Sequence, residues 1–105
     1  MRILDFIVSG QKIVRDPKCY FSGIASGSRG YLKARFRFSA DWRGCKAAVI
    51  FYCRGKEIPV PLKTSIIDIP DDALIGSSVG VKVVGKQGSM VIPTNTIYFE
   101  QTKGV

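Results

Sequence analysis

Eight residues in the first half of the chain, YLKARFRF at Tyr31–Phe38, alternate without interruption between apolar side chains and mainly basic ones. One set of alternate positions holds Leu32, Ala34, Phe36 and Phe38, and the other holds Tyr31, Lys33, Arg35 and Arg37. A period of two residues is that of a β-strand with one face in a hydrophobic core. The segment therefore predicts a strand whose opposite face is exposed and carries a row of cations.

Similar short segments fill most of the remaining sequence. Strand-like patterns cover residues 3–9, 46–53, 57–62, 65–70, 79–85, 90–93 and 96–101, and glycine-containing turns separate several of them. No stretch shows the longer periodicity of an extended helix. Seven or eight short strands predict an all-β fold, an immunoglobulin-like antiparallel β-sandwich, and 105 residues fit a single domain over residues 1–105.

Proline, glycine and tryptophan positions add detail to this fold. Pro59 and Pro61 lack an amide proton, so their strand is expected to lie at a sheet edge or to be irregular. The segment from Pro70 to Gly76 predicts one short helical turn, with Asp71 and Asp72 near its positive N-terminal end. Residues 16–30, rich in glycine and serine, predict a long loop. Trp42 follows the alternating strand in a polar turn, where a single Trp is expected to anchor the core.

The residue types of most enzymatic and metal sites are missing. The chain contains no His, and its three cysteines, Cys19, Cys45 and Cys53, are widely spaced. A tetrahedral zinc site would lack ligands, and the commonest general acid–base residue is absent. We therefore expect free thiols and no catalytic residue, metal or cofactor. The longest apolar run, Ala47–Cys53, is far shorter than the roughly 20 residues of a membrane-spanning helix, so no membrane contact is expected.

Positive charge is concentrated in one half of the sequence. Twelve of the 16 Lys and Arg residues, but only three of the 8 acidic residues, lie within residues 1–56. The exposed positions of the alternating strand, Tyr31, Lys33, Arg35 and Arg37, are the candidate binding residues. Their spacing of about 6.6 Å resembles that of phosphates along a nucleic acid, and Tyr31 is suited to stacking on a base. The alternative is that these cations keep the strand soluble or contact another protein.

Several motifs together resemble a known family. The segments are FRFSADWRGCKAAVIF, IPVPL, IDIPDDAL, VGVKVVG and IPTNTIYF, which span Phe36–Phe99 in this order. They resemble the β-sandwich domain at the start of upper baseplate and related tail proteins of phages that infect Gram-positive bacteria. The resemblance implies structural roles for Trp42, Lys46, Phe51, Ile69, Pro70, Gly85, Pro93 and Thr94. Family members usually continue into a long region that trimerises, which this sequence lacks, and its N-terminal third has no counterpart.

Two functions are compatible with this resemblance. The first is a non-enzymatic phage structural or adaptor protein, a tail, baseplate or head-decoration component. Such a protein is made in the host cytoplasm, resides in the virion and contacts other phage proteins or copies of itself. The second is a soluble phage-encoded inhibitor of host defence. It would bind nucleic acid, a nucleotide signal or an acidic host protein through the basic face of Tyr31, Lys33, Arg35 and Arg37.

Overall fold

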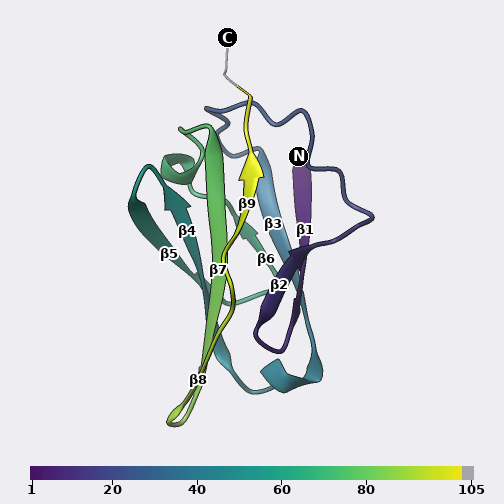
Figure 1. The fold of residues 1–105 in the computed structure, drawn as a ribbon, viewed down its shortest axis with the longest axis vertical. Coiled ribbons are helices and arrows are strands. Elements are labelled where there is room, and N and C mark those ends of the chain that lie inside the picture. Colours follow the sequence, from purple (N-terminus) through teal and green to yellow (C-terminus); the bar gives the residue numbers. More distant parts are fainter. Residues whose placement is uncertain (103–105) are drawn as a thin grey trace.

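Short strands follow one another along residues 1–102, the residues that the computed structural model describes (Figure 1). In chain order the elements are β1 (Arg2–Ser9), β2 (Lys12–Arg15), β3 (Leu32–Phe38), the 3₁₀ turn η1 (Ala40–Trp42), β4 (Lys46–Cys53), β5 (Lys56–Leu62), β6 (Ile66–Asp68), the 3₁₀ turn η2 (Asp71–Ala73), β7 (Ser78–Gln87), β8 (Met90–Pro93) and β9 (Ile97–Glu100). Strand β2 was not expected from the sequence, because four residues are too few to show a clear period. The expected helical turn is η2.

The strands form two sheets that pack face to face, so the predicted all-β sandwich is confirmed. One sheet has the order β2-β1-β3-β6. The other has the order β5-β4-β7-β8, and β9 pairs with β7 beyond the end of β8. All strand pairs are antiparallel except β1 and β3, which run parallel in the register Phe6↔Phe36. The long segment between β2 and β3 makes this parallel pairing possible.

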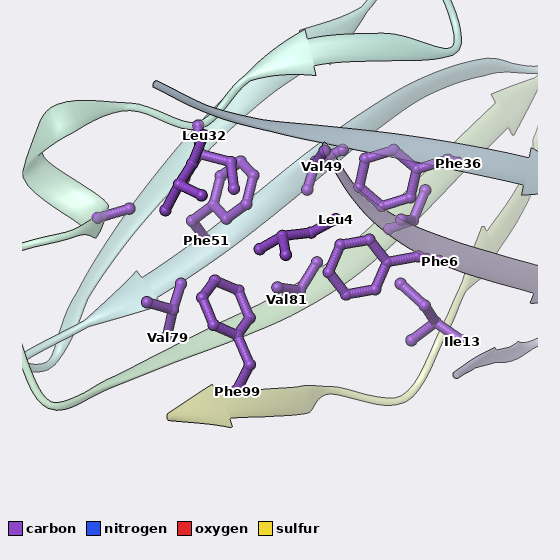
Figure 2. Packing of buried hydrophobic residues seen from close by; sticks show 14 of the residues in the cluster. Leu4, Phe6, Ile13, Leu32, Phe36, Val49, Phe51, Val79, Val81 and Phe99 are labelled. Atoms are coloured by element: carbon purple, nitrogen blue, oxygen red, sulfur yellow. The ribbon is translucent and has the colours of Figure 1, made fainter. Parts of the chain in front are cut away.

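The core lies between the sheets and is built from alternate residues of each strand. Side chains of β1 and β3 point toward those of β4, β7 and β9 (Figure 2). Phe6 and Phe36, opposite each other in the parallel register, stack at a centroid distance of 5.2 Å. The alternation of β3 correctly identified Leu32, Ala34 and Phe36 as buried, whereas Phe38, predicted on the same face, is only half-buried.

Trp42 links the two sheets at one end of the core. Its indole Nε1 donates a 2.9 Å hydrogen bond to the carbonyl oxygen of Gly10, in the turn between β1 and β2. Its ring lies against Gly85 of β7. A Cβ atom at position 85 would lie 2.4 Å from Trp42 Cζ3, closer than side-chain atoms approach each other. Gly85 is therefore required by the close approach of the indole ring to the sheet.

Thr94 and Asn95 lie in the break between β8 and β9. Their side chains bond to the backbone of β7 and β2. The Thr94 hydroxyl accepts a 3.0 Å hydrogen bond from the amide of Val83, in place of a backbone carbonyl. The Asn95 side chain bonds both backbone groups of Ile13, at 2.8 Å from its amide nitrogen and 3.3 Å to its carbonyl oxygen. Two polar side chains thus complete backbone pairing where the strand is interrupted.

Candidate functional site

The predicted basic row lies on the outer face of the β2-β1-β3-β6 sheet. Lys33, Arg35 and Arg37 point away from the core, and Tyr31, just before β3, is 51% exposed. We call Lys33, Arg35 and Arg37 the basic row. The position of the strand and the outward direction of these side chains therefore agree with the sequence pattern. The residues that surround the cations could not be predicted from it.

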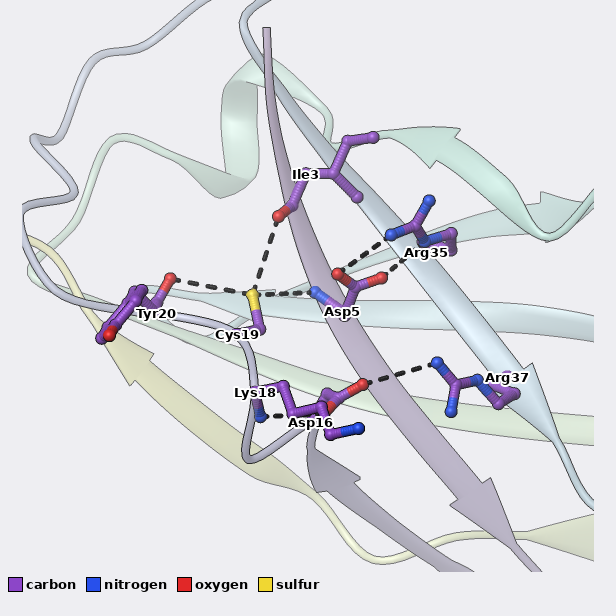
Figure 3. Close-up of polar contacts among 8 residues, drawn as sticks. All are labelled: Ile3, Asp5, Asp16, Lys18, Cys19, Tyr20, Arg35 and Arg37. Atoms are coloured by element: carbon purple, nitrogen blue, oxygen red, sulfur yellow. Dashed lines mark hydrogen bonds and ion pairs between the residues drawn. The ribbon is translucent and has the colours of Figure 1, made fainter.

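Each cation of the basic row has a carboxylate partner from a different part of the chain. Arg35 makes a two-point contact with Asp5 of β1, at 2.6 Å from Nε and 3.2 Å from Nη2 (Figure 3). Lys33 Nζ lies 2.8 Å from Asp68 of β6. Arg37 Nη2 lies 3.6 Å from Asp16, at the end of β2.

The parallel register explains the Asp5 pairing, because it places Asp5 directly beside Arg35. The antiparallel pairing of β3 with β6 likewise places Asp68 beside Lys33. The hydrogen bonds and charge of Asp5 raise the pKa of Arg35 above its usual value. Three carboxylates therefore oppose the three charges of the row, and a phosphate would have to compete with them.

The buried Asp16 is fixed by its own backbone and by its neighbours. Its amide donates to the carbonyl of Asp5 at 2.9 Å, and its side chain accepts a 2.9 Å hydrogen bond from the amide of Lys18. Beyond it, the Cys19 thiol lies 3.4 Å from the amide of Asp5 and 3.7 Å from the carbonyl of Ile3 (Figure 3). Cys19 thus occupies the edge of β1 past the end of β2, and the predicted loop is anchored at this point.

The outer face of the other sheet is mostly apolar. The strand registers bring together there Ala48, Ile50, Tyr52, Pro59, Pro61, Val84, Pro93 and Tyr98, which we call the apolar face. Tyr98 is 54% exposed, and the three prolines are also exposed. A signal for this face was present in the sequence, because KAAVIFYC is apolar on both of its alternating faces. The sequence interpretation missed it by concentrating on charge.

Two tyrosines meet across a glycine on the apolar face. Tyr52 and Tyr98 occupy the strands on either side of Gly80. A Cβ atom on Gly80 would lie 2.9 Å from the Tyr98 ring and 3.0 Å from Tyr52 Cβ, so the rings cover the bare backbone. Burial raises the pKa of Tyr52, and the charge and hydrogen bond of the adjacent Glu57 raise it further. Tyr52 is therefore a neutral phenol at physiological pH.

Charged residues lie mainly at the two ends of the apolar face. Lys46 and Lys86 are cross-strand neighbours at one end. Glu57 on β5 and Glu100 on β9 lie toward the other end. Lys82 lies between the two ends, opposite Ile50. Apart from Lys82, which lies beside Ile50, the sheet face is thus apolar in the middle and charged at its two ends, an arrangement close to the apolar centre and polar rim of a protein contact surface.

The neighbouring edge strand, β5, resists the addition of another strand. Arg54 and Gly55 form the two-residue turn into β5 with φ values of 51° and 77°, which define a type I′ hairpin. In this hairpin Pro59 and Pro61 fall in the non-hydrogen-bonded pairs, so their nitrogens face the free edge. Proline nitrogen donates no hydrogen bond, so this edge is protected, as the sequence predicted.

The remaining residues singled out by the resemblance occupy different environments. Trp42 is 5% exposed and Thr94 is 7% exposed, and both make the contacts described above. Pro70 precedes η2, where Asp71 and Asp72 form the first turn. Pro93 belongs to the apolar face, and Lys46 is exposed at its end.

Within residues 1–102 the structure contains no cluster of three or more potential metal ligands. In the same part of the chain, no helix has the length and apolar character needed to cross a membrane. No family model, curated protein or solved structure matches this sequence.

Proposed function

We propose that the chain is a non-enzymatic phage structural or adaptor protein that acts through protein contacts. The contact surface in this proposal is the apolar face of the β5-β4-β7 sheet. The observation that carries the proposal is the cluster formed on one face of the sheet by the exposed Tyr98, three exposed prolines and the half-buried Ile50, Tyr52 and Val84. Contiguous apolar surface with a charged rim is typical of protein interaction sites.

The protected edge supports contact through a face. Since Pro59 and Pro61 prevent β5 from pairing with a further strand, side chains on the apolar face would carry the contact. Tyr52 and Tyr98 are the best candidates for its energetic centre, because tyrosines contribute large contact area with little loss of conformational freedom. Other phage proteins or further copies of this chain are the proposed partners.

The alternative function, inhibition of host defence through the basic face, has less support. Binding of a phosphate or an acidic protein there requires Arg35 to leave a two-point contact with Asp5. Lys33 and Arg37 also face carboxylates already. On the apolar face, by contrast, Ile50, Val84 and the three prolines have no charge that an internal partner would have to release.

Mass spectrometry of purified particles of the phage that encodes this chain tests the proposal. We expect stoichiometric recovery of the wild-type chain. The Ile50→Glu variant should be lost from particles, because it places a charge in the centre of the apolar face. Ile7→Glu is the matched control on the outer face of β1 and should be retained. Absence of the wild-type chain from particles would refute the proposal.

A further inference from the structure

A pocket opens between the two sheets at the end of the core where Trp42 lies. Its volume is about 400 Å³, within the range of roughly 300–1,000 Å³ found for small-molecule sites. The lining consists of Phe38, Ser39, Ala40, Trp42, Arg43, Cys45, Ala47, Leu62, Lys63, Thr64 and Ser65. None of these residues belongs to the apolar face or the basic row.

The pocket exists because β6 is too short to cover the end of β3. Strand β6 pairs with Lys33, Ala34 and Arg35, and Ser65 adds one hydrogen bond to the amide of Phe36. Phe38, which still pairs with Val8 of β1, therefore has no strand neighbour on the β6 side and remains half-buried. On the opposite side, β4 and β5 end at the pair Ala47↔Leu62, where a small side chain leaves space.

The floor of the pocket is rigid and aromatic. Phe38 and Trp42 lie at a centroid distance of 5.2 Å with an interplanar angle of 44°. Trp42 is held by its hydrogen bond to Gly10 and by its contact with Gly85. Phe38 is half-buried and supplies the more accessible ring, whereas Trp42 is almost fully buried and reaches the pocket through the edge of its indole, whose nitrogen is already bonded.

The polar part of the lining favours a negative charge. Arg43 and Lys63 are exposed cations, and the lining contains no Asp or Glu. Of the hydroxyl groups in the lining, that of Thr64 already donates to the carbonyl of Ile66 and that of Ser39 accepts from the amide of Gly10, so the two cations carry the preference for an anion. This combination differs from the basic row, where every cation faces a carboxylate.

We infer that this pocket binds a compact aromatic anion, with its ring against Phe38 and Trp42 and its negative group near Arg43 and Lys63. The inference concerns a small-molecule site and does not depend on the apolar face. It is also independent of whether the chain is a virion component.

A pair of probes with the same ring system tests both parts of this inference. Anilinonaphthalene sulfonate carries the anion, and phenylnaphthylamine lacks it. We expect the sulfonate to bind more tightly by about tenfold, since an interaction with a charged group contributes on this order. Replacing both cations, Arg43→Gln with Lys63→Gln, should remove this preference while leaving the neutral probe bound. Lys12→Gln with Lys18→Gln removes the same charge elsewhere and should change nothing.

Cysteine labelling locates the bound probe without any substitution. Cys45 lines the pocket and Cys19 lies outside it, and both thiols are free and half-buried. The sulfonate should slow alkylation of Cys45 and leave the rate at Cys19 unchanged.

Filling the pocket with Ala47→Phe should abolish binding, whereas Tyr98→Glu on the apolar face should not. Absence of binding, unprotected Cys45 with bound probe, or equal affinity for the two probes would overturn the inference.

Discussion

Replacing Gly85 by alanine tests the packing that joins the two sheets. The new Cβ atom would lie 2.4 Å from Trp42 Cζ3 and 2.8 Å from Cε3, so the indole must move. Overpacking of this kind costs about 1–3 kcal/mol, and loss of the Trp42–Gly10 hydrogen bond adds about 1 kcal/mol. Alanine gains roughly 0.5–1 kcal/mol over glycine within a strand. The free energy of unfolding should therefore fall by about 1–3.5 kcal/mol.

Urea denaturation followed by circular dichroism measures this change. Gly80→Ala is the comparison on the same strand, and it should cost less than Gly85→Ala, because its new Cβ meets the exposed Tyr98 ring at 2.9 Å, which can rotate away, and otherwise only Tyr52 at 3.0 Å. In a Trp42→Phe background, Gly85→Ala should cost less, with a coupling energy of about 1 kcal/mol or more. A Gly85→Ala protein within about 0.5 kcal/mol of wild type would refute the proposed role of the Trp42 contact.

Three further predictions follow from hydrogen bonds, backbone angles and ion pairs. Thr94→Val should lower the free energy of unfolding by about 1–3 kcal/mol, because the buried amide of Val83 loses its acceptor. An unchanged midpoint of urea denaturation would contradict this. Arg54→Asn should raise it by roughly 0.5–1 kcal/mol, since asparagine tolerates the left-handed φ of 51° in a type I′ turn better than arginine does; a lower melting temperature would count against it. The wild-type chain should show no salt-dependent binding of single-stranded DNA at the basic row. The double variant Asp5→Asn with Asp68→Asn should bind the DNA more tightly at low salt. A slope near −2.7 for log affinity against log salt in the wild type, about that of three neutralised phosphates, would refute the idea that the ion pairs block binding.

Local sequence patterns were sufficient for the strands other than β2 and for the buried face of β3. The alternation of Leu32, Ala34 and Phe36 depends only on the two-residue period of a strand, so no knowledge of its neighbours was needed. The proline nitrogens of β5 likewise predicted a protected edge, because proline lacks an amide proton wherever it lies.

Pairing between distant segments was not predictable from these patterns. Nothing in the local sequence of β1 indicates that it runs parallel to β3, yet this register brings Asp5 to Arg35. Asp16 and Asp68 reach the same surface from two other segments. The sequence therefore predicted the position of the basic row correctly, while its neutralisation depends on the topology.

The central claim, that the apolar face is the surface buried in the assembled state, is tested most directly by tyrosine modification. Tyr98 lies on this face, whereas Tyr31 and Tyr20 lie elsewhere, and all three are at least half-exposed in the isolated chain. Nitration of the free chain and of purified particles, followed by mass spectrometry, compares their reactivity. We predict that Tyr98 becomes protected on assembly while Tyr20 and Tyr31 keep reacting. A reactive Tyr98 in particles that contain the chain, or protection of Tyr31 instead, would contradict the account.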